Sequence, residues 1–170
     1  MQIAAFEQIS ELDQASFVTA LEGIFEHSPW VAERAWAQRP FASTAELRAA
    51  LLAAMTQASH EEQLALIRAH PELAGKAAVA GTLTDESTRE QSGARLDKCS
   101  AEEFARLQAL NAQYNARFGF PFIIAVRGLD RAQIIECFAR RVGNTPELEF
   151  AEALHQISRI ASLRLAERFD

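Results

Sequence analysis

Cysteine is scarce in this chain of 170 residues, which contains only Cys99 and Cys137. The two lie too far apart for a C-x-x-C redox motif or a zinc-binding pair, so we expect free thiols and a reducing compartment. The first residues also lack the basic region and apolar core of a signal peptide, and no apolar run is long enough to cross a membrane. The sequence therefore predicts a soluble, cytoplasmic protein without a membrane partner.

Positive charge is also in short supply. The chain has 17 Lys and Arg residues against 23 Asp and Glu residues, a formal net charge of −6. A nucleic-acid-binding protein usually carries a basic patch or stripe, so this balance argues against a nucleic-acid partner. A small anionic substrate stays compatible with it, because a few arginines can reverse the sign of the charge locally.

Alternating strand patterns are nearly absent, whereas helix start signals recur along the chain. The eight candidate starts are Ser10, Ser28, Ser43, Ser59, Thr84, Ser100, Asp130 and Thr145. The exception is FPFIIAV at residues 120–126, which we expect to pass through the core as an extended or short helical segment. We therefore predict an all-α fold, a single compact domain over residues 1–170 with about eight helices and no significant β-sheet.

The motifs of common cofactor and nucleophile sites are missing as well. The sequence has no G-x-S-x-G, no Gly-rich phosphate loop and no dinucleotide fingerprint. Its four histidines, at positions 27, 60, 70 and 155, show no metal-binding spacing. The residues that remain favour acid–base chemistry without a metal or organic cofactor.

One histidine stands where a helix must end. His70 closes the helical run of residues 62–70, and Pro71 disfavours helical geometry at the residue before it. The carbonyl groups at a helix C-terminus favour a protonated imidazole, which suits a general acid. Taken alone, however, such a histidine is more often packed for structure.

A polar trio follows in the segment STREQ. Ser87, Glu90 and Gln91 are spaced i, i+3 and i+4, so a hydroxyl, a carboxylate and an amide project from one helix face. They could hold an amide-rich small molecule or orient a histidine. On its own, the trio fits a solvated helix face better.

Arg164 lies on the apolar face of the last predicted helix, four and seven residues after Ile160 and Ile157. A buried guanidinium is costly unless it is paired. Arg164 therefore needs either a structural carboxylate, for which Glu90 is the candidate, or an anionic ligand. A ligand with urea or imide groups would also suit the irregular, apolar backbone of residues 119–126.

Four stretches in this order resemble one family: HPELAGK, STREQ, FGFPFIIAVRG and EALHQISRIASLRL. The chain is similar to the 2-oxo-4-hydroxy-4-carboxy-5-ureidoimidazoline (OHCU) decarboxylases of urate degradation, over nearly its whole length. The resemblance implies an all-α fold, a homodimer and no cofactor. It also implies that the chain is a carboxy-lyase whose substrate is OHCU and whose products are (S)-allantoin and carbon dioxide.

The resemblance further implies roles for particular residues. His70, Glu90 and Arg164 match the catalytic positions of the family. The implied substrate-binding residues are Pro71, Ser87, Thr88, Arg89, Glu90, Gln91, Phe122, Ile123, Ile124, Ala125, Val126 and Arg164. Two alternatives are a helical module that binds a partner without catalysis, and an enzyme of this fold that acts on another ureido or imidazoline compound.

We predict that chelators leave decarboxylation intact, because the sequence offers no metal-ligand spacing. The measurement is OHCU turnover before and after dialysis against EDTA. Loss of turnover that zinc or another divalent ion restores would contradict this prediction.

Overall fold

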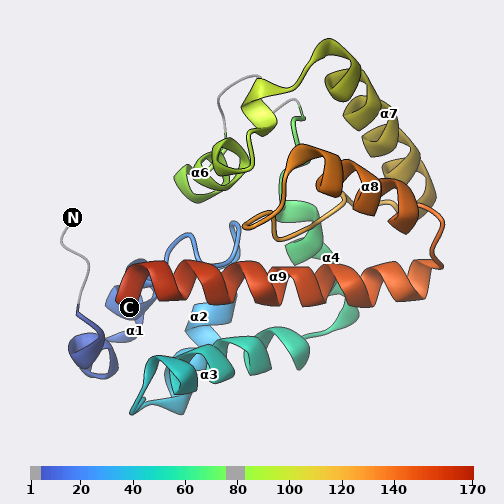
Figure 1. Ribbon diagram of the computed structural model, residues 1–170. Coiled ribbons are helices and arrows are strands. Elements are labelled where there is room, and N and C mark those ends of the chain that lie inside the picture. Colours follow the sequence, from blue (N-terminus) through green and yellow to red (C-terminus); the bar gives the residue numbers. More distant parts are fainter. Residues whose placement is uncertain (1–4, 76–82) are drawn as a thin grey trace. The chain divides into compact units, whose positions relative to one another are not determined.

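The computed structural model describes residues 5–75 and 83–170, and all of the regular secondary structure in those ranges is helical. They form eight α-helices and three 3₁₀ helices, and they contain no β-strand (Figure 1). The α-helices are α1 (Gln14–Ala20), α2 (Pro29–Ala35), α3 (Thr44–Thr56), α4 (His60–Ala69), α6 (Asp85–Gly93), α7 (Ala101–Phe118), α8 (Arg131–Arg141) and α9 (Pro146–Phe169). The 3₁₀ helices are Phe6–Glu11, Trp36–Gln38 and Leu96–Lys98. The predicted all-α class is confirmed, and each of the eight predicted helices has a counterpart.

Capping side chains set most helix starts. The Ser100 hydroxyl accepts from the backbone N–H of Glu103 at 3.1 Å, and the Glu103 carboxylate accepts from Ser100 N–H at 3.0 Å. Asp130 and Gln133 form the same reciprocal pair at the start of α8. These bonds satisfy N–H groups that a helix N-terminus leaves without partners. The predicted starts are accurate here because the signal and its structural effect lie within four residues.

The first predicted helix is wrong at both ends. Ser10 does not begin it: that residue lies in the 3₁₀ helix Phe6–Glu11, and the N-cap of α1 is Asp13, whose carboxylate accepts from Ser16 N–H at 2.8 Å. The helix ends at Ala20 rather than continuing along the apolar residues that follow. Gly23 adopts a φ of 86°, which a right-handed helix cannot include.

The described chain divides into two compact units. Unit 1 comprises Met1–Leu66 and Ser158–Asp170, and unit 2 comprises Ile67–Ile157, so the boundary falls within α4 and within α9. In unit 1, α2 and α3 lie side by side (Figure 1). The largest fully buried side chains of unit 1 are Ile9, Phe17, Ile24, Leu47, Leu51, Met55 and Leu66.

Unit 2 is built around an aromatic cluster between α7 and α8. The rings of Phe122 and Phe138 stack with centroids 3.9 Å apart, and Tyr114 meets both edge-on at 5.5 and 5.8 Å. All three side chains are buried. Phe104, in the first turn of α7, is 40% exposed.

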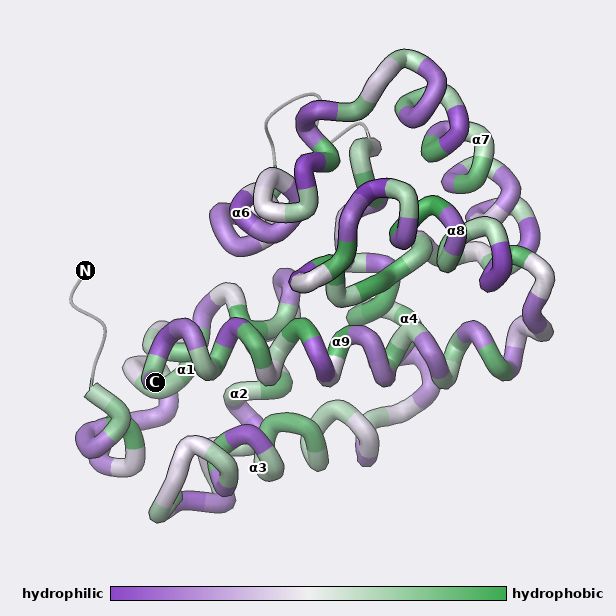
Figure 2. Tube along the Cα trace, in the orientation of Figure 1, coloured by the Kyte–Doolittle hydropathy of each residue, from purple (hydrophilic) through white to green (hydrophobic). Residues whose placement is uncertain are grey.

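Residues 121–126 cross the core of unit 2 without regular structure. They contain neither helix, strand, turn nor bend, and residues 122–126 are all buried. The prediction of an apolar segment that is not a sheet strand is confirmed, and the helical option is excluded. Figure 2 shows the contrast with α6, which is hydrophilic along almost its whole length.

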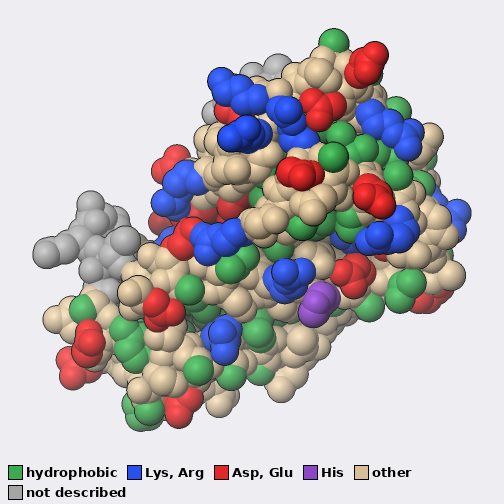
Figure 3. Space-filling model, viewed as in Figure 1, with side chains coloured by type: hydrophobic (Ala, Val, Ile, Leu, Met, Phe, Trp, Pro, Cys, Tyr) green, Lys and Arg blue, Asp and Glu red, His purple; other side chains and the backbone are tan. Residues whose placement is uncertain are grey.

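Charged side chains of both signs cover the surface. On the face shown in Figure 3, basic and acidic groups are interspersed rather than gathered by sign. Within residues 5–75 and 83–170, no helix is both long enough and apolar enough to cross a membrane.

Glu149 is the centre of a buried polar cluster in unit 2. Its carboxylate accepts from the Tyr114 hydroxyl at 2.5 Å, from Asn144 Nδ2 at 2.9 Å and from Arg141 Nη2 at 2.8 Å. Burial alone would raise the pKa of Glu149, but the hydrogen bonds from Arg141, Tyr114 and Asn144 outweigh it and hold this pKa below its ordinary value. Burial and the neighbouring carboxylate raise the pKa of Tyr114.

We predict that protonation of Glu149 lowers the stability of the protein in acid. Because its folded-state pKa is lowered, its contribution is present above the unfolded pKa of about 4.3 and is lost as the pH falls through the folded pKa. The free energy of unfolding, measured by urea denaturation from about pH 6 to pH 3, should therefore fall with a slope that Glu149→Gln reduces by about one proton. Equal slopes in both proteins would contradict the prediction. Glu147→Gln, at an exposed position of α9, removes the same charge without touching the cluster.

Candidate active site

His70 follows the last residue of α4 and is buried, with 7% of its surface exposed. Its backbone N–H donates to the Ile67 carbonyl at 3.2 Å, which closes the helix with a tighter turn. The helix ends before Pro71 as predicted. His70 therefore lies at the C-terminus of α4, where a helix leaves carbonyl groups without intrahelical partners.

The turn after His70 contains a strained residue. Ala74 has a φ of 50°, in the left-handed region that an L side chain rarely adopts. Its N–H donates to Gln91 Oε1 at 3.0 Å, and its carbonyl accepts from Gln108 Nε2 at 2.8 Å. Such strain persists only where surrounding interactions hold the residue in place. Here one side-chain amide binds the N–H of Ala74 and another binds its carbonyl.

Three further bonds hold the same turn. Gln91 Nε2 donates to the Glu72 carbonyl at 3.3 Å, and Asn111 Nδ2 donates to the Leu73 carbonyl at 3.0 Å. Asn115 Nδ2 donates to the Glu72 carboxylate at 2.5 Å. One amide of α6 and two amides of α7 thus bind the backbone that follows His70, and a third amide of α7 binds the Glu72 side chain.

The sequence analysis missed the three α7 amides. Gln108, Asn111 and Asn115 are spaced i, i+3 and i+7, so they follow one stripe of the helix. A stripe of amides beside the apolar stripe is the signal that could have revealed them. Two buried side-chain atoms in residues 5–75 and 83–170, His70 Nε2 and Asn111 Oδ1, make no hydrogen bond, although His70 has a further interaction within the protein.

The predicted polar face of α6 is present. Ser87 and Gln91 are buried and Glu90 is half-buried, as their spacing requires, whereas Thr88 and Arg89 are exposed. The amide of Gln91 is committed to the turn at residues 72–74. This helix therefore contributes both a polar face and an anchor for the backbone after His70.

Backbone groups of residues 122–126 are held by side chains. Arg141 Nη1 donates to the Ile123 carbonyl at 2.7 Å, and Ala125 N–H donates to Gln156 Oε1 at 2.9 Å. Arg68, in the last turn of α4, donates from Nε to the Gly119 carbonyl at 3.1 Å. A chain of hydrogen bonds inside unit 2 thus connects the end of α4, the turn after His70, α6 and the start of the apolar segment.

Arg164 belongs to unit 1, where it is 3% exposed, as its place on the apolar stripe predicts. Its Nη2 donates to Glu26 Oε1 at 2.9 Å, and its Nη1 donates to the Gly23 carbonyl at 2.9 Å. Glu26 is 1% exposed, so both charges of this ion pair are desolvated. This ion pair joins residues 138 positions apart in the sequence, and the suggestion of Glu90 as a counter-charge stays a prediction.

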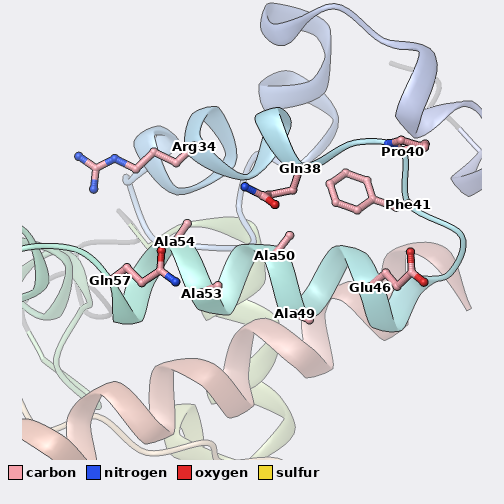
Figure 4. Close-up of a pocket in the computed structure, with 10 residues that line it drawn as sticks. All are labelled: Arg34, Gln38, Pro40, Phe41, Glu46, Ala49, Ala50, Ala53, Ala54 and Gln57. Atoms are coloured by element: carbon pink, nitrogen blue, oxygen red, sulfur yellow. The ribbon is translucent and has the colours of Figure 1, made fainter.

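A pocket of about 510 Å³ lies in unit 1 beside α3, and it contains none of the predicted site residues (Figure 4). Its lining residues are Arg34, Gln38, Pro40, Phe41, Glu46, Ala49, Ala50, Ala53, Ala54 and Gln57. Its two charged side chains have structural tasks: Arg34 pairs with Glu62, and Glu46 accepts from Ala42 N–H at 2.8 Å. Across the described ranges, no group of three or more His, Cys, Asp or Glu side chains is placed to hold a metal ion.

The chain matches a known family over almost its whole length. The family model described as OHCU decarboxylase matches residues 10–166, which include parts of both units. The 2-oxo-4-hydroxy-4-carboxy-5-ureidoimidazoline decarboxylase of Haloferax volcanii is 46% identical over 169 residues, 99% of this chain and 98% of that protein. The Mus musculus protein of the same name is 40% identical over 160 residues, 94% of this chain and 90% of that protein.

Two solved structures share the fold. The crystal structure of an (S)-allantoin synthase matches with a TM-score of 0.74 and 31% identity over 98% of this chain and 55% of that one, so this chain spans about half of that protein. A crystal structure of OHCU decarboxylase in the presence of (S)-allantoin matches with a TM-score of 0.68 and 22% identity over 86% of this chain and 94% of that one.

We predict that Arg164→Met lowers the free energy of unfolding by about 3–5 kcal/mol, because it leaves the buried Glu26 carboxylate without its cation. Adding Glu26→Gln should recover much of that loss, since the charge is then removed too. Urea denaturation of both proteins measures the effect. Arg159→Met, at an exposed position of α9, is the matched control and should change stability by less than about 0.5 kcal/mol. Wild-type stability in Arg164→Met would contradict the prediction.

Proposed function

The chain belongs to the OHCU decarboxylase family, and we propose that it converts OHCU to (S)-allantoin and carbon dioxide as the last step from urate to allantoin. The observation that carries the proposal is the setting of His70, a buried imidazole at the end of α4 beside a turn that α6 and α7 hold in place. A general acid needs such a fixed direction, because the product is chiral.

The reaction makes three demands on a protein. The bond between the quaternary ring carbon and the carboxylate breaks, and its electron pair passes into the adjacent C=N group. The carboxylate must therefore stand out of the ring plane, so that the breaking bond overlaps the π system. A proton must then reach one face only of the resulting carbanion, which gives a single enantiomer.

His70 delivers that proton in our proposal. The carbonyl end of α4 favours the imidazolium form, and Pro71 prevents the helix from continuing past the ring. Positioned proton transfer of this kind is typically worth about 10²–10⁴-fold in rate. Glu90, on the neighbouring polar face with Ser87, orients the imidazole or the substrate.

The remaining site residues bind the substrate. Residues 122–126 offer backbone N–H and C=O groups to the ureido and ring groups, and Pro71 and residues 87–91 complete the polar wall. Thr88 and Arg89 are exposed, so they contribute to the site through their backbone or not at all. Arg164 stabilises negative charge, and its ion pair with Glu26 fixes the orientation of its guanidinium.

We further propose that residues 1–170 act as one family domain, that the protein works as a cytoplasmic homodimer, and that it needs neither metal nor organic cofactor. The match of the family model to residues 10–166 supports the first point. The homodimer and the compartment follow from the resemblance and from the cysteine content of the sequence.

The proposed function is tested by the handedness of the product. OHCU is generated from urate with urate oxidase and hydroxyisourate hydrolase, and circular dichroism follows the allantoin that forms. The wild-type protein should give (S)-allantoin, whereas spontaneous decay gives the racemate. A racemic product at the uncatalysed rate would contradict the proposal and favour a non-catalytic module or a different ureido substrate.

We predict that His70→Asn folds but loses at least about 10²-fold of the decarboxylase rate, the low end for a general acid. The same circular dichroism assay measures the rate, and the melting temperature monitors the fold. His155→Asn, an exposed histidine of α9, is the control and should retain activity. A folded His70→Asn protein with a near-normal rate would show that another group donates the proton.

A further inference from the structure

We propose that Arg141 is a positioning residue for this reaction: with Gln156, it aligns residues 122–126 so that the backbone of Ile124 meets the ureido or imide groups of the substrate. The inference rests on the proposed function and goes beyond it, because it assigns work to residues outside the predicted site.

Arg141 contacts two consecutive residues of the segment 122–126. Its Nη1 donates to the Ile123 carbonyl at 2.7 Å, and its guanidinium carbon lies 4.3 Å from the centroid of the Phe122 ring. Phe122 is in turn stacked on Phe138. The planar guanidinium of Arg141 thus positions both the Ile123 carbonyl and the neighbouring Phe122 side chain.

Glu149 holds that planar group in place. Arg141 Nε donates to both oxygens of the Glu149 carboxylate, at 3.2 and 3.1 Å, and Nη2 donates to Oε2 at 2.8 Å. Arg141 is 5% exposed and Glu149 is fully buried. A desolvated ion pair is often no more stabilising than apolar residues of the same volume, so stability alone does not account for it. What distinguishes the Arg141 guanidinium is its fixed geometry: its five N–H groups point in set directions, so it can hold a bonded group in one orientation.

Gln156 holds the segment two residues further on. Its Oε1 accepts from Ala125 N–H at 2.9 Å, and its Nε2 donates to Glu152 at 2.7 Å. Arg141 and Gln156 thus bind the Ile123 carbonyl and the Ala125 N–H, the backbone groups on either side of Ile124.

The N–H and the C=O of Ile124 lie in the chain between these two held residues. A donor and an acceptor on one residue match the N–H and C=O of a urea or imide group, which form the same pair in reverse. Ile124 is 7% exposed, so a ligand bonded there competes with little water. The arrangement selects a ureide of the kind that the proposed reaction uses.

The test replaces the whole ion pair, because removing one partner could unfold the protein. Arg141→Met/Glu149→Leu keeps the volume apolar and should fold. Gln156→Leu acts separately on Ala125. In both variants we expect KM for OHCU to rise at least about tenfold, the effect of weakening one hydrogen bond to the substrate, in protein with native helical circular dichroism. Arg140→Met, at an exposed position of α8, is the control with wild-type KM.

If Arg141 and Gln156 had only a structural role, the variants would lose rate in proportion to their unfolded fraction and keep the wild-type KM. That result would overturn the positioning role. The wild-type protein separates this failure from that of the proposed function. If the wild-type protein binds (S)-allantoin in calorimetry but does not turn over OHCU, the proposed function fails. The Kd for (S)-allantoin then tests the positioning role: a higher Kd in the variants than in wild type supports it, and an equal Kd overturns it. If wild type neither turns over nor binds, both proposals fail.

Discussion

Buried backbone that is not helical must find its hydrogen bonds elsewhere, and this constraint shapes unit 2. The turn after His70 and the apolar segment at residues 122–126 both leave the helical pattern inside the protein. Amide side chains from α6 and α7 serve the first, and Arg141 and Gln156 serve the second. The helices of this unit are therefore more than packing elements, because their polar side chains satisfy the backbone at the proposed active site.

This arrangement predicts that the candidate site is rigid although it has no regular structure. Ala74 is held in a left-handed conformation by one amide on each side, and the carbonyl of Ile123 is held by a guanidinium that is itself fixed by Glu149. A site prepared in this way spends little of the substrate's binding energy on ordering the protein. In unit 1, Arg164 is held in place in a similar way, because its guanidinium donates to Glu26 and to the Gly23 carbonyl.

Local signals predicted more than long-range ones. The capping residues Ser100 and Asp130 were identified because each acts on a residue three positions away. The burial of Arg164 followed from helical spacing, and the position of His70 followed from the proline after it. The ion pair of Arg164 with Glu26 could not be found in this way, since Glu26 is 138 residues distant and many carboxylates could pair with a buried arginine. The same holds for Arg141 and Gln156, whose backbone partners lie in another part of the chain.

Amide hydrogen exchange of the substrate-free protein tests the central claim most directly, because it measures whether the irregular backbone is fixed before the substrate arrives. The N–H groups of Ala74 and Ala125 donate to Gln91 and Gln156 and should exchange as slowly as interior amides of α7. Exchange of either amide at the rate of an exposed loop position such as Gly128 would contradict the account.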